Sequence, residues 1–376
     1  MESIGQYTPQ REFTTLGGGQ SEWTVARTDA GEEFFVKRYL QPVVPDPDLG
    51  LSESTMRRLH DRVAYFRARQ MSVIGRLDEE QFRRNVVGSK DFFEHEGRFY
   101  KVTPLIDEVS AIPLVRLPVQ DVASVLFGAV TAVEYLHQRT IVHGDIKPEN
   151  ILISRNADDV LDAYLIDLDE GYVVGYAPSR EDIVGTIGYY SPELGNYVAG
   201  HAEGSTLTTA SDIFSLALTL AEMLTGSVPG FDRNRYRTAA HALGNRQTLD
   251  LTACGEPLAD LLGRMLVLDP SARPSAPEVL DHIGNLDLDR LLDGAAVPPN
   301  GSDVADGSSA DRTGPLTGTV ALVDDGEGQG EDDDVALDDA SADGDTRTGL
   351  GDVEASSDDE SGLIINLGRP TDREDS

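Results

Sequence analysis

Cysteine and lysine are both scarce in this chain of 376 residues. The one cysteine, Cys254, has no partner for an internal disulfide, and the sequence holds no cysteine and histidine cluster at the spacing of a structural zinc site. We therefore expect Cys254 to be a core residue. Among the 31 cations only four are lysines and the others are arginines, so each lysine is a candidate for a specific role. The four are Lys37, Lys90, Lys101 and Lys147.

Positive charge and long hydrophobic runs are also lacking. The 66 acidic residues outnumber the 31 basic ones and give a formal net charge of −35. Phosphate contacts need a basic face, so nucleic acid is not expected among the partners. No apolar run approaches the roughly 20 residues of a membrane helix, and the opening MESIGQYTPQ has no signal-peptide character. We therefore expect a cytoplasmic protein with no membrane partner.

The acidity is concentrated toward the C-terminal end, where residues 301–376 carry 22 acids and 4 bases. Glycine, aspartate, serine and threonine dominate there, and such a segment buries too little apolar area to offset its ordering entropy. We predict that residues 300–376 are disordered. The segment is either a solubilising extension or a regulatory, partner-docking arm. Features that suit the arm are candidate autophosphorylation sites at Thr313, Thr317 and Thr319, and an apolar island at residues 363–367.

The pattern of the remaining chain predicts an α+β protein. Its first part reads as a small antiparallel sheet with one helix, and its second part reads as mainly helical. The expected strands are residues 12–16, 23–27, 33–39, 92–93 and 99–102, and the expected helix between them is 56–77. Further along, we expect a helix that ends near His137, short apolar runs at 151–153 and 164–166, and helices at 211–224 and 258–268.

The stretch HGDIKPEN at residues 143–150 gathers polar side chains between two apolar runs. Proline prevents a regular helix at this point, so several of these side chains can be aimed into one cleft. Phosphoryl transfer needs a carboxylate to accept a proton, a cation near the moving phosphate and oxygen ligands for Mg²⁺. Asp145, Lys147 and Asn150 suit these three roles in that order. Asp167, which closes the 164–166 run, suits a second metal ligand.

Five motifs in order resemble consecutive parts of a eukaryotic-type (Hanks-type) serine/threonine protein kinase: HGDIKPENILI, LIDLD, GTIGYYSPE, SDIFSLALTLAEMLTG and LLGRMLVLDPSARPS. The resemblance covers about residues 11–292 and is to a prokaryotic-like, non-RD variant. It implies a bilobal protein-kinase fold with an N-lobe at 1–105, a C-lobe at 106–292 and an acidic tail at 293–376. It also implies an enzyme, dependent on ATP and Mg²⁺, that phosphorylates serine and threonine in protein substrates, in signalling or regulation.

The same resemblance implies roles for individual residues. Asp145 matches the catalytic base, and Lys147 matches the cation beside the γ-phosphate. Asn150 and Asp167 match the Mg²⁺ ligands. Thr186 matches the threonine that bridges the base and the lysine.

Three further residues match parts of the kinase scaffold. Glu193 would form a buried ion pair with Arg273. Asp212 would anchor the backbone of the catalytic loop from a buried helix.

The nucleotide site is implied by residues nearer the start of the chain. Lys37 matches the strand lysine that holds the α- and β-phosphates. A glycine-rich loop precedes it, and its backbone amides would cover the phosphates. Either Ser21 or Glu22 takes the place of the third loop glycine, and Ser21 is preferred because a carboxylate would repel phosphate. The loop glycines are Gly17, Gly18 and Gly19.

Three positions depart from the family pattern. Gly144 stands where many kinases carry an arginine that grips a phosphorylated segment, so we expect activity without phosphorylation of residues 167–193. Asp169 stands where glycine is usual, and its extra carboxylate either tightens or distorts Mg²⁺ binding. Gln70 stands where a glutamate would pair with Lys37, and its amide can hydrogen-bond but cannot form an ion pair.

Two functions remain open at this point. An active protein kinase is supported by the presence of the base, both lysines and both metal ligands. A pseudokinase that acts as a nucleotide-binding scaffold is the alternative, supported by the departures at Gln70, Gly144 and Asp169. A small-molecule substrate is disfavoured because Thr186 and residues 191–193 resemble a peptide-docking surface.

Overall fold

The computed structural model of the chain describes residues 2–15, 21–78, 81–106, 113–156 and 159–296. The predicted acidic tail lies almost wholly outside the described residues, and so do the candidate threonines and the apolar island within it. Gly17, Gly18 and Gly19 also lie outside them. The division predicted at residues 105 and 292 stays a prediction.

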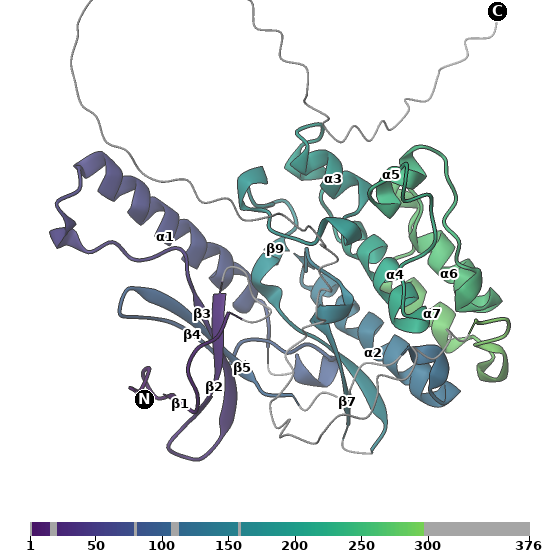
Figure 1. Cartoon of the computed structure of the whole chain (residues 1–376), viewed down its shortest axis with the longest axis horizontal. Coiled ribbons are helices and arrows are strands. Elements are labelled where there is room, and N and C mark those ends of the chain that lie inside the picture. Colours follow the sequence, from purple (N-terminus) through teal and green to yellow (C-terminus); the bar gives the residue numbers. More distant parts are fainter. Residues whose placement is uncertain (1, 16–20, 79–80, 107–112, 157–158, 297–376) are drawn as a thin grey trace, which may run out of the picture.

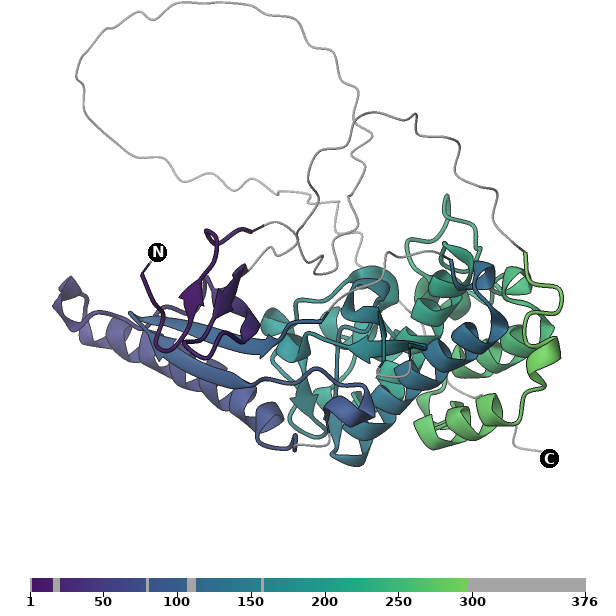
Figure 2. The ribbon, with the colours of Figure 1, turned by 90° about the horizontal axis from the view of Figure 1, so that it is seen from below.

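Two parts of different architecture lie side by side (Figures 1 and 2): a sheet with helix α1 at one end of the molecule and a group of helices at the other. This confirms the predicted bilobal α+β fold. The sheet is antiparallel in the order β1-β2-β3-β5-β4. Its strands are β1 (Thr8–Pro9), β2 (Ser21–Arg27), β3 (Glu33–Tyr39), β4 (Asp91–His95) and β5 (Arg98–Pro104).

One predicted strand is wrong. Residues 12–15 make only an isolated bridge, between Thr14 and Trp23, and the strand that pairs with the end of β2 is β1. The buried hydroxyl of Thr24 donates to the carbonyl oxygen of Arg11 at 2.8 Å, which takes the place of a ladder hydrogen bond. A side chain therefore interrupts the pairing where the alternation pattern predicted continuous strand.

The two faces of the sheet have different chemistry because side chains alternate along each strand. One face carries an apolar cluster that includes Phe34 and Val36 of β3 with Tyr100 and Val102 of β5. The intervening residues of the same strands point to the opposite face. Lys37 of β3 is the register partner of Lys101 of β5, so both ammonium groups extend from that face. This face meets α1 and the helical part.

Helix α1 (Glu53–Ile74) begins at Ser52, whose hydroxyl oxygen accepts from the backbone amide of Thr55 at 3.2 Å. The N-terminal end of the helix extends past the sheet, and its C-terminal half lies along the sheet (Figure 1). There Phe66 packs its ring against those of Tyr39 and Phe99. The buried residues of α1 are Gln70 and Val73, so the helix presents an amide, and not a carboxylate, to the interior.

The helical part is built around α2 (Val119–Gln138) and α4 (Ala210–Thr225), whose apolar side chains form the main core. Helix α2 is long and apolar enough to cross a membrane, but most of it is buried inside the protein, as in a core helix. Cys254 is buried, which confirms its predicted place in the core. The remaining elements are β6 (Ile141–Val142), β7 (Ile151–Arg155), β8 (Leu161–Leu165), β9 (Tyr172–Val173), α3 (Pro192–Val198), α5 (Ala239–Gly244), α6 (Glu256–Met265) and α7 (Ala276–Gly284).

Candidate active site

The loop at residues 143–150 connects β6 to β7 and is held from beneath by helix α4. The buried carboxylate of Asp212 accepts from the backbone amides of His143 at 2.8 Å and Gly144 at 3.1 Å. The ring of His143 is fully buried, with Nε2 2.9 Å from the carbonyl oxygen of Ile166. The predicted anchoring by Asp212 is therefore confirmed. It fixes the backbone from which the candidate catalytic side chains extend.

Asp145, Lys147 and Thr186 form a closed triangle of contacts. The ammonium of Lys147 lies 2.8 Å from Oδ2 of Asp145 and donates to the hydroxyl oxygen of Thr186 at 2.9 Å. The backbone amide of Thr186 donates to Oδ1 of Asp145 at 3.0 Å. A carboxylate and an ammonium are thereby held together in fixed orientation.

Asn150 and Asp167 leave adjacent segments, because the amide of Ile166 donates to the carbonyl oxygen of Asn150 at 2.9 Å. The side-chain amide nitrogen of Asn150 donates to the carbonyl oxygen of Asp145 at 2.7 Å, so the acceptor Oδ1 is the atom of this side chain that could bind a cation. Among the described residues there is no group of three or more His, Cys, Asp or Glu that could hold a metal ion. Two hard oxygen ligands suit a divalent ion that arrives with nucleotide phosphates, since such ions keep substrate and water oxygens as their other ligands.

Lys37 reaches across from the sheet to the segment that carries Asp167. Its ammonium donates at 2.9 Å to each carboxylate oxygen of Asp167 and at 2.9 Å to Oδ2 of Asp169. Burial alone would lower the pKa of Lys37, but the two carboxylates outweigh it and raise that pKa well above its ordinary value. Lys37 is therefore a cation at neutral pH and lies beside a predicted metal ligand.

Asp169 differs from its expectation. The sequence suggested an extra carboxylate acting on the metal, but the carboxylate turns to the sheet, where it also contacts Lys101 at 2.5 Å and the Tyr39 hydroxyl at 2.6 Å. Burial alone would raise the pKa of Asp169, whereas the ammonium groups of Lys101 and Lys37 hold it well below its ordinary value. Asp169 is therefore an anion, and it forms ion pairs with Lys37 and Lys101.

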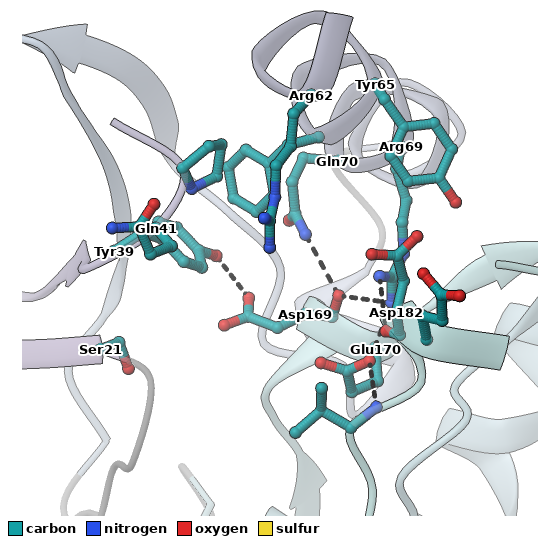
Figure 3. Close-up of a pocket in the computed structure, with 14 residues that line it drawn as sticks. Ser21, Tyr39, Gln41, Arg62, Tyr65, Arg69, Gln70, Asp169, Glu170 and Asp182 are labelled. Atoms are coloured by element: carbon teal, nitrogen blue, oxygen red, sulfur yellow. Dashed lines mark hydrogen bonds and ion pairs between the residues drawn. The ribbon is translucent and has the colours of Figure 1, made fainter. Parts of the chain in front are cut away.

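The sequence suggested that Gln70 would hydrogen-bond Lys37, but the structure gives Gln70 a different partner. Its side-chain amide donates to the backbone carbonyl oxygen of Asp169 at 3.1 Å (Figure 3). The neighbouring Arg69 donates to the same oxygen at 3.2 Å and to the carboxylate of Glu170 at 2.9 Å. A neutral amide suits a backbone acceptor, so Gln70 holds the chain at Asp169 and leaves Lys37 to the two aspartates.

Gly144 stands at a position that only glycine fits. Its φ is +81°, and a Cβ there would lie 2.9 Å from the carbonyl oxygen of Glu170. Gly144→Ala should cost about 1–3 kcal/mol of unfolding free energy from backbone strain, with the clash in addition, measured by denaturant unfolding. Gly175→Ala is the matched control, because φ is +85° there but nothing lies within 4 Å of the added Cβ. Equal losses in the two variants would show that the close approach to Glu170 is not what matters.

The predicted ion pair between Glu193 and Arg273 is confirmed. Arg273 Nη1 donates to Oε1 of Glu193 at 2.6 Å, and Nη2 donates to Oε2 at 2.9 Å. The Arg273 side chain is fully buried and also donates to backbone carbonyl oxygens, among them that of Ala210 at 2.7 Å. The pair joins the start of α3 to the segment before α7, which fixes the end of the 167–193 segment.

Sequence reasoning missed Lys101 and Tyr39 as parts of this site. Lys101 occupies a strand among aromatic and β-branched residues, and its side chain is only 6% exposed. The scarcity of lysine was the one available signal, since it made each lysine worth examining. The strand pairing that sets Lys101 beside Lys37 needs the register of β3 and β5, and alternation within one strand does not supply that register.

Comparison with known proteins places most of this site within one family. The family described as "Protein kinase domain" matches residues 68–283, which is more than half of the chain. The matched region begins in the C-terminal half of α1 and reaches into α7. Lys37 precedes it, so the placement of this lysine in the site depends on its contacts with Asp167 and Asp169.

Individual relatives share modest identity with the chain. Calcium-dependent protein kinase 4 of Plasmodium falciparum is 27% identical over 208 residues, covering 53% of this chain and 37% of that protein. Aurora/IPL1-related protein kinase 2 of Caenorhabditis briggsae is 32% identical over 160 residues, covering 42% and 48%. Calcium/calmodulin-dependent protein kinase cmkA of Emericella nidulans is 29% identical over 212 residues, covering 53% and 48%. The chain spans less than half the length of each of these relatives.

Proposed function

The chain belongs to the protein kinase domain family, and on that premise we propose that it is an ATP-dependent serine/threonine protein kinase. One observation carries the proposal: the Lys147 ammonium contacts the Asp145 carboxylate at 2.8 Å and the Thr186 hydroxyl at 2.9 Å, and the Thr186 backbone amide donates to Asp145 at 3.0 Å. An acceptor hydroxyl placed beside this triangle would meet a base and a cation together. That combination is what phosphoryl transfer requires of a protein.

Each residue of the site has a separate role in the proposed reaction. Asp145 accepts the proton of the attacking hydroxyl, while Lys147 lies next to the moving phosphoryl group and offsets its charge. Lys37 binds the phosphates of ATP that are not transferred. Asn150 and Asp167 would hold the divalent ion, which we propose is Mg²⁺ because their oxygens are hard ligands. When bound, the ion would offset the negative charge of the phosphates.

The pseudokinase alternative is not favoured. Each departure that supported it is accounted for by contacts that leave the catalytic residues in place. Asp169 provides the carboxylate that Gln70 does not, and Gly144 fits a backbone conformation that excludes larger side chains. A scaffold that only binds nucleotide would also not need the triangle of contacts among Asp145, Lys147 and Thr186.

Phosphate transfer from labelled ATP to a generic basic protein tests the proposal. We expect incorporation in the presence of Mg²⁺, none after chelation, and the label on serine and threonine when the acceptor is hydrolysed. Nucleotide binding is measured in parallel by titration. Binding of ATP without transfer to any acceptor would contradict the kinase function and support the scaffold.

We also propose that the segment at 167–193 needs no phosphate for activity. Glu170 within this segment pairs with Arg69 of α1 at 2.9 Å, and Arg69 Nη1 donates to the carbonyl oxygen of Asp182 at 3.5 Å. A carboxylate of the chain itself therefore provides the kind of contact that a phosphorylated side chain would otherwise make. Treatment with a phosphatase before the transfer assay should leave the rate unchanged.

The acidic tail is proposed as an arm that docks protein partners, in a protein located in the cytoplasm. Its net negative charge and its apolar island at residues 363–367 support this role. Truncation after Asn300 should abolish capture of partners from a lysate and leave transfer to a generic acceptor within about twofold, because the core and the catalytic triangle precede it. Partner capture that is unchanged by truncation would show that the tail only adds solubility.

A further inference from the structure

A carboxylate buried against the sheet connects two lysines at the centre of the molecule. Oδ2 of Asp169 accepts from Lys37 at 2.9 Å, and Oδ1 accepts from Lys101 at 2.5 Å and from the Tyr39 hydroxyl at 2.6 Å. All three donors extend from one face of β3 and β5. The side chains of Asp169, Lys37 and Lys101 are 16%, 16% and 6% exposed, so water screens their charges poorly.

The two lysines need this carboxylate. Lys37 and Lys101 are register partners on neighbouring strands, and like charges at such positions destabilise a sheet. Asp169 lies between their ammonium groups and offsets one of the two charges. Lys37 also contacts the carboxylate of Asp167 at 2.9 Å, so the two ammonium groups and the two carboxylates balance one another in charge.

The backbone of Asp169 extends the same connection to helix α1. Its carbonyl oxygen accepts from Gln70 and Arg69, so one residue ties β3, β5 and α1 to the segment that carries the metal ligand Asp167. Figure 3 shows Asp169 between Tyr39 on the sheet side and Gln70 on the helix side, next to a cavity of about 190 Å³. The carboxylate for Lys37 thus comes from the metal-binding segment, and the helix contributes only amide and guanidinium donors.

We propose that Asp169 and Lys101 are positioning residues for ATP: Asp169 orients the ammonium of Lys37 toward the phosphates, and Lys101 supplies the second ammonium that offsets the charge of the Asp169 carboxylate. The inference rests on the proposed kinase function for its kinetic readout, but its binding readout is independent of transfer. In this arrangement the anion that pairs with Lys37, Asp169, belongs to the same segment of the chain as the proposed metal ligand Asp167. Nucleotide binding therefore does not depend on a carboxylate delivered by α1.

Asp169→Asn is the first test, because it keeps the shape of the side chain and removes its charge. We expect KM for ATP and the dissociation constant of Mg-ATP to rise about 10- to 100-fold, the scale of one lost hydrogen bond to a charged group. The turnover number should change less, because Lys37 binds phosphates that are present in both the ground state and the transition state. A purely structural role would instead reduce the active fraction and lower the turnover number at constant KM.

Lys101→Met keeps most of the side-chain volume and removes the second cation, so it should also raise the dissociation constant of Mg-ATP, by about tenfold. Lys90→Met is the matched control, since Lys90 is an exposed lysine near the start of β4 and should leave the constant unchanged. Equal constants for Lys101→Met, Lys90→Met and the unmodified chain, with melting temperatures unchanged, would overturn the role of Lys101.

Transfer of the carboxylate to the helix provides a rescue. In the Asp169→Gly/Lys101→Met background, addition of Gln70→Glu places an anion on the buried face of α1 and should recover at least about tenfold in ATP affinity. Failure to recover in a folded triple variant, or an Asp169→Asn variant with unchanged KM and affinity, would overturn the inference. If the unmodified chain binds Mg-ATP but transfers no phosphate, the kinase function fails, and the affinities of these variants still decide the positioning roles.

Discussion

Replacing Asp145 by asparagine should lower the rate of phosphate transfer by about 10²- to 10⁴-fold, the usual contribution of a general base. The substitution keeps the side-chain shape, so the amide oxygen can still accept from the Thr186 backbone amide, whereas the contact from the Asn150 side chain to the second oxygen is lost. It removes the negative charge that lies 2.8 Å from the Lys147 ammonium and the group that accepts the hydroxyl proton. The loss should therefore fall on the turnover number, while the affinity for Mg-ATP stays within a few-fold.

The measurement is transfer of labelled phosphate under single-turnover conditions, with nucleotide titration on the same preparations. Asp61→Asn is the control, because Asp61 is an exposed carboxylate on α1 and its removal should leave both quantities unchanged. A residual rate within threefold of the unmodified chain would show that Asp145 is not the base. A parallel loss of nucleotide affinity and turnover would point to a disrupted loop.

Replacing Glu193 by glutamine should reduce the free energy of unfolding by about 3–5 kcal/mol, the cost of breaking a buried ion pair by removing one partner. Arg273 would remain charged and fully buried, with neutral acceptors, the glutamine oxygen and backbone carbonyl oxygens such as that of Ala210, in place of a carboxylate. The side chain of Glu193 is 5% exposed and also accepts from the hydroxyl of Ser211 at 2.9 Å. The substitution therefore leaves a buried guanidinium uncompensated at a junction of three elements.

The shift of the urea unfolding midpoint measures this loss, converted through the slope of the transition. Glu33→Gln is the matched control, since its ion pair with Arg27 is formed by side chains that are 41% and 50% exposed. Exposed pairs of this kind contribute about 0–1 kcal/mol. Equal midpoint shifts in the two variants would contradict the importance of burial.

The amino-acid sequence by itself determined the parts of the protein whose residues are close together along the chain. The loop at 143–150 contains the candidate base Asp145, Lys147 and Asn150 within eight residues, so any fold that keeps it irregular brings them near one another. Amphipathic and apolar periodicity located α1, α2 and α4 within a few residues. The failure at residues 12–15 arose where a side chain, Thr24, took a backbone acceptor and interrupted the strand.

Only the tertiary structure decided which charges meet at the centre of the site. Lys37 and Asp169 are 132 residues apart, and Lys101 and Asp169 are 68 apart. Whether a carboxylate at position 169 faces the metal or the sheet depends on how the segment after β8 packs against β3, β5 and α1. Local pattern carries no information on that packing, because it is set by strand register and by the contact between two separate parts of the fold. The sequence thus located the candidate catalytic loop, and the packing of the sheet against the helices determined which carboxylates pair with Lys37.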